Sequence, residues 1–595
     1  MRTASVDRPS SHVLLLFVLV AALAPVASRV LPGVLNDYRS LVACFGVAYA
    51  VAALPLNLLM GSAGQVSFGH AAFLGVGAFT SGIVAGRLGL PFVVGLVAAM
   101  AAGALTTLLI GFPALRIRGL YLGLVTLAFG LAMYSFAFRL PALSGGYAGL
   151  PIPRPKVGAF VFSNNGDLLG VAILLLGLVW LVDRNVMRTK VGRAFLALRQ
   201  DEDIAGTFGV DVRAYKLCAF VLYGALSAAA GSLLGHVIGF AQQEMFTFES
   251  SLIFVVIVVL GGTRSRTAVA IAAFLFGAGP RLFVVLNDWL PITGPALVLA
   301  GLVLRGRKPS NTDRGAAPER TSVLSRLGHT AALRPAASTA DRPLVVRDLS
   351  VRFGGVTAVD SVCLDVERAT VTGLIGPNGA GKTTLFNAVS GLVHADGGTV
   401  CVNGADMTDA PPHRRAAAGV GRTFQQIGLI KDLTVTDNLL LAQHRLCSYG
   451  PIAAVGYLPA VARGERSIRR RTSETIGELG LRHLADAPLA ELSHGQQRLV
   501  EMAAVFLTSP GLLLLDEPTA GLSPAAVEEL AKRLVQFRDD FGQTMFVIEH
   551  HLPLVMSVCD RVHVMGSGRL LTSGTPAAVR RDPDVVAAYL GSKAG

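Results

Sequence analysis

Two short motifs in the second half of the chain contain the residue types of a nucleotide-hydrolysing site. The first is the glycine-rich run Gly376-Pro-Asn-Gly-Ala-Gly-Lys-Thr-Thr, which follows the β-rich run Val371–Ile375. Glycines let the backbone approach a phosphate closely, so that the N–H groups of the loop and of the next helix face its oxygens. The second is Leu512-Leu-Leu-Leu-Asp-Glu-Pro, an apolar run that ends in two acids. Together the two motifs predict an ATP site.

Each residue of the glycine-rich run has a separate task in this chemistry. Lys382 is expected to reach the β- and γ-phosphates, and Thr383 to offer its hydroxyl to Mg²⁺. Residues 382–391 are predicted to form the helix that the motif requires after its loop. The other predicted members of the phosphate-binding loop are Gly376, Pro377, Asn378, Gly379, Ala380, Gly381 and Thr384.

The apolar run before the two acids fits a strand that is buried on both faces, as in a parallel α/β sheet. Asp516 then emerges at the carboxyl end of that sheet, where it is expected to bind Mg²⁺ through water. Glu517 beside it is placed to accept a proton from the attacking water. An Asp-Glu pair after apolar residues often arises by chance. It is informative here because the glycine-rich loop occurs in the same chain.

The composition divides the chain into two unlike halves. A chain of 595 residues is too long for one core, and its charged content of 15% is below that of soluble proteins. We predict a helical membrane domain at 1–305, a flexible linker at 306–342 and an α/β ATP-binding domain at 343–595. The net charge of +13 is attributed to cytoplasmic loops, because Lys and Arg gather between the apolar segments. No nucleic-acid partner is expected.

The first half contains apolar segments near the length of about 20 residues that crosses a bilayer, and eight to ten of them are expected to do so. They are residues 12–32, 38–60, 66–86, 90–113, 119–141, 166–183, 215–241, 249–263, 267–285 and 289–304. The segments at 249–263 and 289–304 are short enough to be broken or re-entrant. The first segment also resembles a signal peptide, with a basic start and a small-residue end, but we expect an uncleaved first span.

Basic residues orient these spans through the positive-inside rule. The ATP-binding domain meets ATP in the cytosol, so counting backwards from it gives ten spans with both ends inside. The basic residues assigned to the inside are Arg116, Arg118, Arg184, Arg188, Lys190, Arg193, Arg199, Arg264, Arg266, Arg305, Arg307 and Lys308. The 142–165 loop falls outside. Arg29, Arg39 and Arg87 lie on the unexpected side.

Four further motifs surround the predicted ATP site in a definite order. They are Phe353, Gln425 in Arg-Thr-Phe-Gln, the run Leu492-Ser-His-Gly-Gln-Gln, and His550 in Val-Ile-Glu-His. With them the chain resembles the ATP-binding cassette (ABC) family. Alone, Phe353 also fits a core residue and His550 an ordinary strand-end histidine. The resemblance implies the fold class: an α-helical polytopic membrane domain followed by an α/β P-loop ABC ATPase domain.

The resemblance also implies roles for these residues. Ser493, Gly495 and Gln496 belong to the cassette signature, which in the family binds the γ-phosphate held by an opposing cassette. Gln425 senses Mg²⁺ and contacts the membrane domain, so that the implied metal set is Thr383, Gln425 and Asp516. The implied catalytic set is Glu517, His550 and Gln425, and Phe353 stacks on adenine. His494 and Ser523 depart from the commonest pattern, where Gly and Asp stand.

Motifs in both halves narrow the resemblance to the importers of branched-chain amino acids. In the cassette these are the 420–425 run, the long insertion at 444–481, Ala520-Gly-Leu-Ser-Pro and the ending Asp582-Pro-Asp-Val-Val. In the membrane half they are Gly64-Gln-Val-Ser-Phe-Gly-His, Arg116-Ile-Arg-Gly-Leu-Tyr, Gly145-Gly-Tyr-Ala-Gly-Leu, Gly192-Arg-Ala-Phe and Phe246-Thr-Phe-Glu-Ser-Ser. The chain therefore looks like a permease fused to its ATPase. Gly261-Gly-Thr-Arg-Ser-Arg departs from the family pattern.

The resemblance implies ATP-driven import of branched-chain or hydrophobic amino acids across the cytoplasmic membrane, with ATP and Mg²⁺ as cofactors. The implied partners are a second permease subunit, a second ATPase subunit and an extracytoplasmic solute-binding protein. Import of urea or short amides is the alternative, and an ATP-gated sensor or channel is another. A zwitterion is expected to meet backbone dipoles at broken helices such as 61–82. His70 there is expected to be a packing histidine rather than a ligand.

The 184–214 loop is the expected mechanical link between the two halves. It combines Asp201-Glu-Asp with a helix-prone stretch that runs to Gly209. We predict that it forms a coupling helix seated in a groove of the ATPase, and the alternative is a solvated charged loop.

Overall fold

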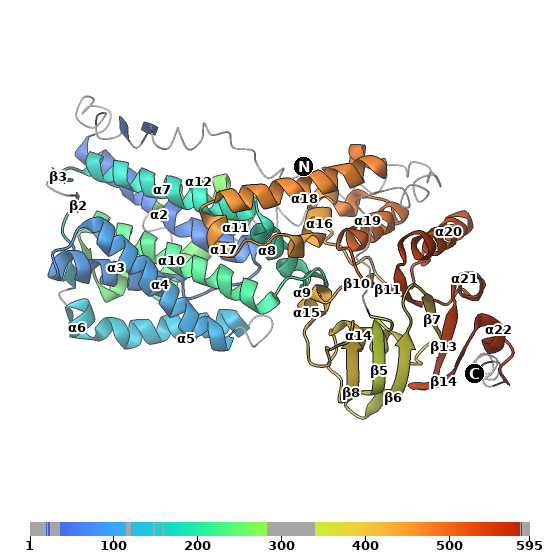
Figure 1. Cartoon of the computed structure of the whole chain (residues 1–595). Coiled ribbons are helices and arrows are strands. Elements are labelled where there is room, and N and C mark those ends of the chain that lie inside the picture. The colour runs from blue at the N-terminus through green and yellow to red at the C-terminus, as the bar shows by residue number, and fades with distance from the viewer. Residues whose placement is uncertain are drawn as a thin grey trace.

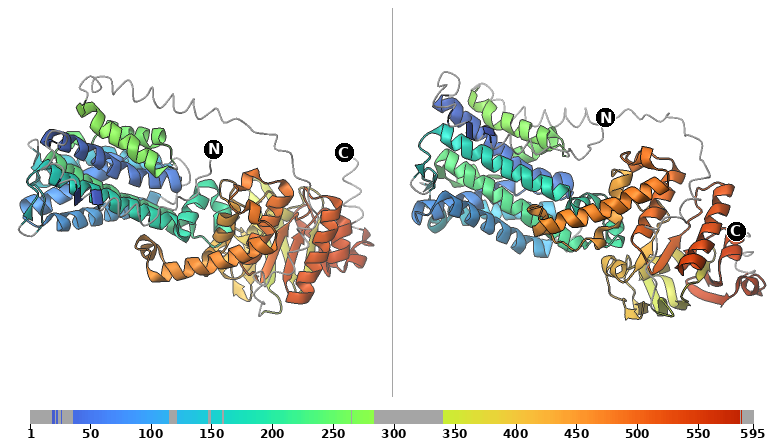
Figure 2. Two further views of the ribbon diagram at one scale, coloured as in Figure 1. Left: turned by 90° about the horizontal axis from the view of Figure 1, so that it is seen from above. Right: turned by 45° about the horizontal axis from the view of Figure 1, so that its top comes forward.

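The computed structural model describes residues 36–114, 121–146, 149–157, 160–263, 265–282 and 340–583, together with Val585 and five residues within 19–26. A helical bundle forms one end of the molecule and an α/β domain the other (Figures 1 and 2). The predicted span at 289–304, most of the predicted span at 12–32 and nearly all of the predicted linker lie outside the described residues. So do Arg116, Arg118 and Arg264.

Every predicted apolar segment within the described part of the chain forms a helix. The helices of the bundle are α2 (Asp37–Asn57) with the π-helical η1 (Leu58–Ser62), α3 (His70–Gly82) with η2 (Ile83–Arg87), α4 (Phe92–Ala114), α5 (Tyr121–Ser135), α7 (Asn165–Met187), α10 (Val212–Ile238), α11 (Phe248–Gly261) and α12 (Arg266–Leu282). In this part of the chain, six helices are long and apolar enough to span a membrane. The helices α3 and α12 are not among these six candidate spans. The predicted count of eight to ten membrane spans therefore stays a prediction. Gln243–Gly261, which includes most of the predicted segment 249–263, is one of the six.

The bundle packs around α10, which contacts α2, α3 and α4. Small residues let the backbones of α3 and α10 touch. A Cβ atom on Gly77 would lie 1.9 Å from the Ala228 carbonyl oxygen, and one on Gly231 would lie 1.9 Å from that of Leu74. Such close approach is how helices associate where lipid supplies no hydrophobic drive.

His70 lies inside this bundle as a packing residue. Its Nδ1 atom is 3.1 Å from the Tyr223 hydroxyl, and its ring meets that of Phe254 edge-on at 4.9 Å between centroids. The Ser67 hydroxyl is 3.1 Å from the same Tyr223 oxygen. These contacts agree with the predicted hydrogen-bonded histidine.

The end of the bundle that points away from the α/β domain contains the loop predicted to lie outside (Figure 1). Here β1 (Leu150–Pro151) pairs with β4 (Phe240–Ala241), and the short helix α6 (Pro141–Ser144) follows η3 (Ala137–Arg139). Arg87 donates to the carbonyl oxygens of Pro141 and Ala142. The hydrogen bonds to these carbonyl oxygens give a local reason for Arg87 to lie on the outer side, where the positive-inside rule disfavours a basic residue.

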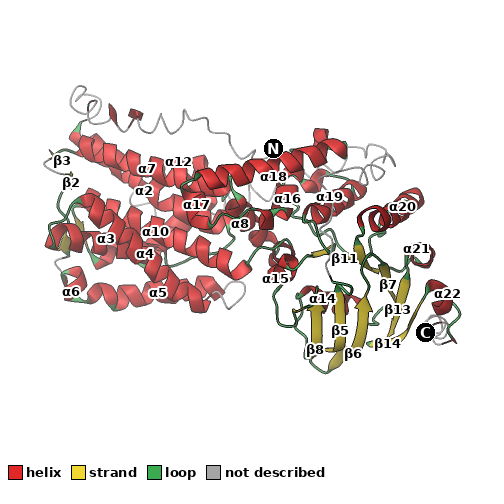
Figure 3. Cartoon of the chain, viewed as in Figure 1, coloured by secondary structure: helices red, strands yellow, loops and turns green. Residues whose placement is uncertain are grey.

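Two sheets form the α/β domain (Figure 3). The larger has the order β10-β11-β12-β7-β13-β14 and is parallel up to β13. Its strands are β7 (Val371–Ile375), β10 (Val420–Arg422), β11 (Leu512–Asp516), β12 (Thr544–Ile548), β13 (Arg561–Gly566) and β14 (Arg569–Gly574). The smaller is antiparallel, with β6 (Val356–Val366), β5 (Leu344–Phe353), β8 (Gly397–Val402) and β9 (Ala405–Asp406). Both predicted strands of the ATP site are therefore found.

Helices surround these sheets and fill the segment between β10 and β11. They are α14 (Lys382–Ser390), α15 (Pro412–Ala417), α16 (Val435–Ala442), α17 (Pro451–Val455), α18 (Pro459–Glu478), α19 (His494–Leu507), α20 (Pro524–Phe541), α21 (Leu552–Val558) and α22 (Pro576–Val579). The long helix α18 begins beside the bundle, next to α17, and leads back to the α/β domain in every view (Figures 1 and 2). The insertion thus contributes a contact between the two halves.

Candidate nucleotide site and its contact with the membrane domain

Four neighbouring strands deliver the predicted site residues to one edge of the larger sheet. Because β10, β11, β12 and β7 run parallel, their carboxyl ends lie at the same edge. Gln425 follows β10, Glu517 follows β11, His550 follows β12 and Gly376 follows β7. Residues that are far apart in the sequence are thereby brought together.

The glycine-rich loop has the predicted strand–loop–helix context between β7 and α14. Gly381 has a φ of +94°, and a Cβ atom there would lie 2.2 Å from the Ala358 carbonyl oxygen. Only glycine fits this position without displacing the backbone of β6. Lys382 is buried, and its Nζ atom donates to the carbonyl oxygens of Gly376 and Pro377, each at 2.8 Å. The ammonium group therefore points along the loop.

The three predicted catalytic residues converge on one carboxylate. Gln425 Nε2 donates to Glu517 Oε2 at 3.1 Å, and His550 Nε2 is 3.0 Å from Glu517 Oε1. The Glu517 backbone has a φ of 48°, and its N–H donates to the Ile548 carbonyl oxygen at 3.0 Å. A positive φ is costly for a residue with a side chain and is typical of functional sites. This group is called the Glu517 cluster below.

Asp516 occupies a buried position beside this cluster. Arg422 Nη2 lies 3.2 Å from its Oδ2 atom, and both side chains are buried. Burial raises the pKa of the Asp516 carboxyl group, and the Arg422 guanidinium opposes that rise. Among the described residues Asp516 Oδ1 has no hydrogen-bond partner. A buried carboxylate oxygen in this state fits a cation or its coordinated water, so the residues present are compatible with Mg²⁺.

The remaining predicted residues of the nucleotide site lie in the glycine-rich loop with the first turn of α14, and at the end of β5. Asn378, Gly379 and Thr383 are exposed along the loop and the first turn of α14, and Phe353 is exposed at the end of β5. Ala380 is buried, whereas Thr384 is partly buried.

The signature residues lie at the start of α19 and outside the Glu517 cluster. Ser493 caps this helix: Gln496 N donates to Ser493 Oγ at 3.3 Å, and Ser493 N donates to Gln496 Oε1 at 3.0 Å. Gly495 follows in the first turn. The His494 ring borders Gly521, where an added Cβ atom would lie 2.9 Å from it. The two departures from the family pattern thus lie close together, since Ser523 follows Gly521 by two residues.

A second buried ion pair, which the sequence reasoning missed, ties α19 to the Glu517 cluster. Arg498 and Glu501 are 2.6 Å apart, and both are buried. Arg498 donates to the carbonyl oxygens of Phe424 and Glu517, each at 2.8 Å. Glu501 accepts from the N–H groups of Phe424 at 3.1 Å and Gly428 at 2.8 Å. The available signal was the pair at spacing i, i+3 at the start of the apolar part of the helix.

The predicted coupling segment forms two helices that dock on the α/β domain. They are α8 (Lys190–Gln200) and α9 (Glu202–Thr207), between α7 and α10. The prediction of a seated coupling helix is confirmed, and the alternative of a solvated loop is wrong. Lys190 and Arg193 are only 8% and 4% exposed. Within the acidic triplet, Asp201 is exposed and caps α9, and Glu202 pairs with Lys216 of α10.

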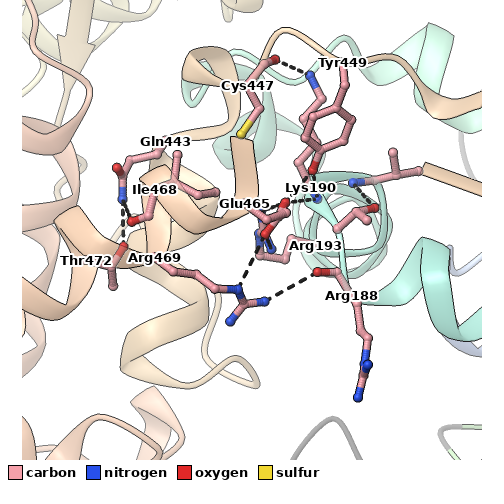
Figure 4. A network of polar contacts seen from close by, with 12 residues as sticks. Arg188, Lys190, Arg193, Gln443, Cys447, Tyr449, Glu465, Ile468, Arg469 and Thr472 are labelled. Atoms are coloured by element: carbon pink, nitrogen blue, oxygen red, sulfur yellow. Dashed lines mark hydrogen bonds and ion pairs between the residues drawn. The ribbon is translucent and has the colours of Figure 1, made fainter. Parts of the chain in front are cut away.

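A cluster of buried polar groups joins α8 to the insertion (Figure 4). Arg193 binds the Glu465 carboxylate through two hydrogen bonds of 2.8 and 3.0 Å. The backbone N–H of Lys190 lies 2.9 Å from both Glu465 Oε1 and the Tyr449 hydroxyl, and the hydroxyl itself donates to Glu465. Lys190 Nζ donates to the Cys447 carbonyl oxygen at 2.6 Å. These five residues are called the Glu465 cluster below.

The surroundings of Glu465 favour its charged form. Burial alone would raise its pKa, but the Arg193 guanidinium and the Tyr449 hydroxyl hold the pKa of Glu465 below its ordinary value. Sequence reasoning missed this residue, although a signal was present. Val461, Ile468 and Ile476 form the buried face of α18, and Glu465 occupies a position in that apolar stripe.

Comparisons with known proteins agree with both halves of the chain. Residues 38–304 match the family described as "Branched-chain amino acid transport system / permease component", and residues 359–520 match "ABC transporter". Residues 569–595 match "Branched-chain amino acid ATP-binding cassette transporter".

Curated relatives are similar to the cassette half. The "High-affinity branched-chain amino acid transport ATP-binding protein BraF" of Pseudomonas aeruginosa is 41% identical over 251 residues, which are 42% of this chain and 98% of that protein. The chain belongs to the branched-chain amino acid family of ABC transporters. The "High-affinity branched-chain amino acid transport ATP-binding protein LivG" of Escherichia coli K12 is 38% identical over 248 residues, which are 42% of this chain and 97% of that protein.

A solved structure, titled as a nucleotide-free ATP-binding cassette from an ABC transporter, is 31% identical and covers 42% of this chain and 98% of its own, with a TM-score of 0.36. The matched relatives correspond to the cassette alone, whereas this transporter carries the permease domain in the same chain. It is a membrane protein with an ATP-hydrolysing cassette, and its family works as assemblies of several subunits.

The Glu517 cluster generates a direct prediction for this transporter. Glu517→Gln is expected to lower the ATPase rate by about 100-fold or more, because the amide cannot accept a proton from water. Nucleotide binding should persist, since Lys382 and the loop are unchanged. Phosphate release and binding of a fluorescent nucleotide would be measured on the purified protein.

The matched control is Glu528→Gln, an exposed glutamate on α20. Its ATPase rate should equal that of the unchanged protein. A Glu517→Gln protein that hydrolyses ATP at the normal rate would show that this carboxylate is not the base.

Proposed function

We propose that the chain is the fused permease and ATPase of an importer that carries branched-chain or other hydrophobic amino acids across the cytoplasmic membrane. The family membership supports the transported class, and the printed names of the relatives refer to branched-chain amino acid transport. The cassette faces the cytosol in this proposal. The basic loop 184–216 lies at the cassette end of the bundle, as the positive-inside rule requires.

The observation that carries the proposal is the Glu465 cluster. A buried, hydrogen-bonded ion pair joins the helix between α7 and α10 to the domain that contains the Glu517 cluster. An ATPase that only signalled would not need so rigid a junction with two membrane-spanning helices. Movements of the cassette are therefore passed to the bundle through α8.

At the nucleotide site we assign the roles from the positions of the residues and, for the adenine contact of Phe353 and the Mg²⁺ contact of Gln425, from the family resemblance. Glu517 accepts the proton of the attacking water, while Gln425 and His550 hold its carboxylate in place. Lys382, Thr383 and the loop amides bind phosphate oxygens, and Phe353 packs on the adenine ring. Thr383, Gln425 and Asp516 would hold Mg²⁺, which would neutralise charge on the phosphates.

The energetics of transport call for a second cassette. Reversing a 1:99 equilibrium between two access states takes about 5.5 kcal/mol of differential binding. Two clamped nucleotides supply this more readily than one. The signature residues Ser493, Gly495 and Gln496 lie at the start of α19, and by the family resemblance we assign them to the nucleotide of the opposing cassette. The proposed partners are thus a second ATPase, a second permease and an extracytoplasmic solute-binding protein.

The Glu465 cluster predicts an uncoupling variant. Glu465→Gln removes the charge that Arg193 and Lys190 compensate, and the buried cations then loosen the junction. We expect the amount of solute moved per ATP hydrolysed to fall by about tenfold, because the amide leaves the buried cations without a compensating charge. ATP hydrolysis itself should continue, since the Glu517 cluster is untouched. Both rates would be measured in proteoliposomes.

The control for this experiment is Glu478→Gln, an exposed glutamate at the last turn of the same helix. It should leave the ratio unchanged. Unaltered coupling in the Glu465→Gln protein would contradict the assigned role of the cluster.

The substrate assignment predicts the outcome of an uptake assay. Cells that lack their own systems for both solutes would express the chain with its candidate companion subunits and receive labelled leucine or urea. We expect leucine to accumulate and urea not, and the Glu517→Gln chain to accumulate neither. Accumulation of urea alone would replace the amino-acid assignment with the urea alternative.

A further inference from the structure

The insertion of the cassette ends in a short apolar tip at the level where the membrane helices end. The tip consists of residues 451–458, namely α17 and the turn that leads into α18. Asn185, in the last turn of α7, donates through Nδ2 to the Val455 carbonyl oxygen at 2.9 Å. In all three views the tip is the part of the cassette that extends furthest alongside the bundle (Figures 1 and 2).

Large apolar side chains of the tip face outward. Ile452 is 90% exposed, Leu458 is 51% exposed and Tyr457 is 39% exposed. The neighbouring span of α7 ends at Met187, and Arg184 and Arg188 mark its cytoplasmic boundary. An isoleucine this exposed is unfavourable in water, but it is favourable where headgroups meet acyl chains.

Positive charge surrounds the tip. Arg463 and Arg466 are exposed on the first two turns of α18, so Arg466 lies about 10 Å along the helix from its start. On the other side, a crowd of basic groups lies beside the tip: Arg469 Nη2 donates to the Arg188 carbonyl oxygen at 3.4 Å, and burial and the neighbouring charges of Arg184, Arg266 and Arg469 lower the pKa of Arg188.

The acidic residues near these arginines already form ion pairs with other residues. Glu465 lies inside its own cluster with Arg193, and Asp183 pairs with Arg266. Positive charge therefore exceeds negative charge around the tip. An exposed apolar edge within a surplus of arginine is the combination that binds an anionic membrane surface.

We propose that the tip is a lipid-binding site for anionic phospholipids of the cytoplasmic leaflet. Ile452, Tyr457 and Leu458 enter the boundary between headgroups and acyl chains. Arg463 and Arg466 attract the phosphate groups of the lipid headgroups. The cassette then has a second attachment to the membrane besides the Glu465 cluster. This attachment involves neither the transported solute nor the Glu517 cluster, and it rests on the proposed function only for the cytosolic orientation of the cassette.

Quenching of tryptophan fluorescence by brominated lipid tests the proposal on the full chain. Ile452→Trp would be made in a background in which Trp180 and Trp289 are replaced by Phe, and reconstituted into nanodiscs that contain phosphatidylglycerol with brominated acyl chains. Its quenching should be several-fold stronger than that of Glu478→Trp, an exposed position at the far end of α18. If the double Phe background does not fold, the same comparison uses difference spectra in the natural background.

The arginines and the rival occupant are tested with the same signal. Reversing both charges, with Arg463→Glu and Arg466→Glu, should reduce the quenching of the Ile452→Trp protein in phosphatidylglycerol, and nanodiscs of brominated phosphatidylcholine alone should quench it less. Equal quenching at positions 452 and 478 would overturn the proposal, because the tip would then lie in water. Quenching that disappears when a companion permease subunit is assembled would also overturn it, because the occupant would be protein.

Discussion

The bidentate pair between Arg193 and Glu465 is the contact on which the relation of the two domains depends. Removing two charges from water is costly, and their attraction repays that cost only in a fixed geometry with further hydrogen bonds. Here Tyr449 and the backbone N–H of Lys190 supply them. Breaking such a buried pair typically costs about 3–5 kcal/mol. The cassette is therefore held to α8 at a defined position rather than resting against it.

Packed elements continue from this junction to the chemistry. Helix α16 contacts α8, α18 and α19. From α19, the Arg498–Glu501 pair reaches the backbone of Glu517 and the segment that contains Gln425. The packed elements between α8 and the Glu517 cluster are contiguous, with a buried ion pair at each end. A movement of the Glu517 cluster can therefore be transmitted to α8. Because buried ion pairs tolerate little displacement, such a route acts as a stiff connection.

Sequence patterns predicted the parts of the site that local chemistry fixes. The β7 strand, the glycine-rich loop and α14 follow from residue types at set spacings, and β11 follows from its apolar run. The convergence on Glu517 was implied only by family resemblance, because it depends on the strand order. Glu465 was missed because its partners come from another domain. The acidic triplet was noticed for its charge, and in the structure its first residue, Asp201, caps α9.

Cutting the chain between the domains tests the account most directly. A protease site would be placed within residues 309–339, and the purified transporter would be cleaved in proteoliposomes with its companion subunits present. Because the Glu465 cluster holds the cassette, we predict that the two fragments stay together and that solute moved per ATP is unchanged. Fragments that separate, or that hydrolyse ATP without moving solute, would contradict the claim that this buried junction carries the coupling.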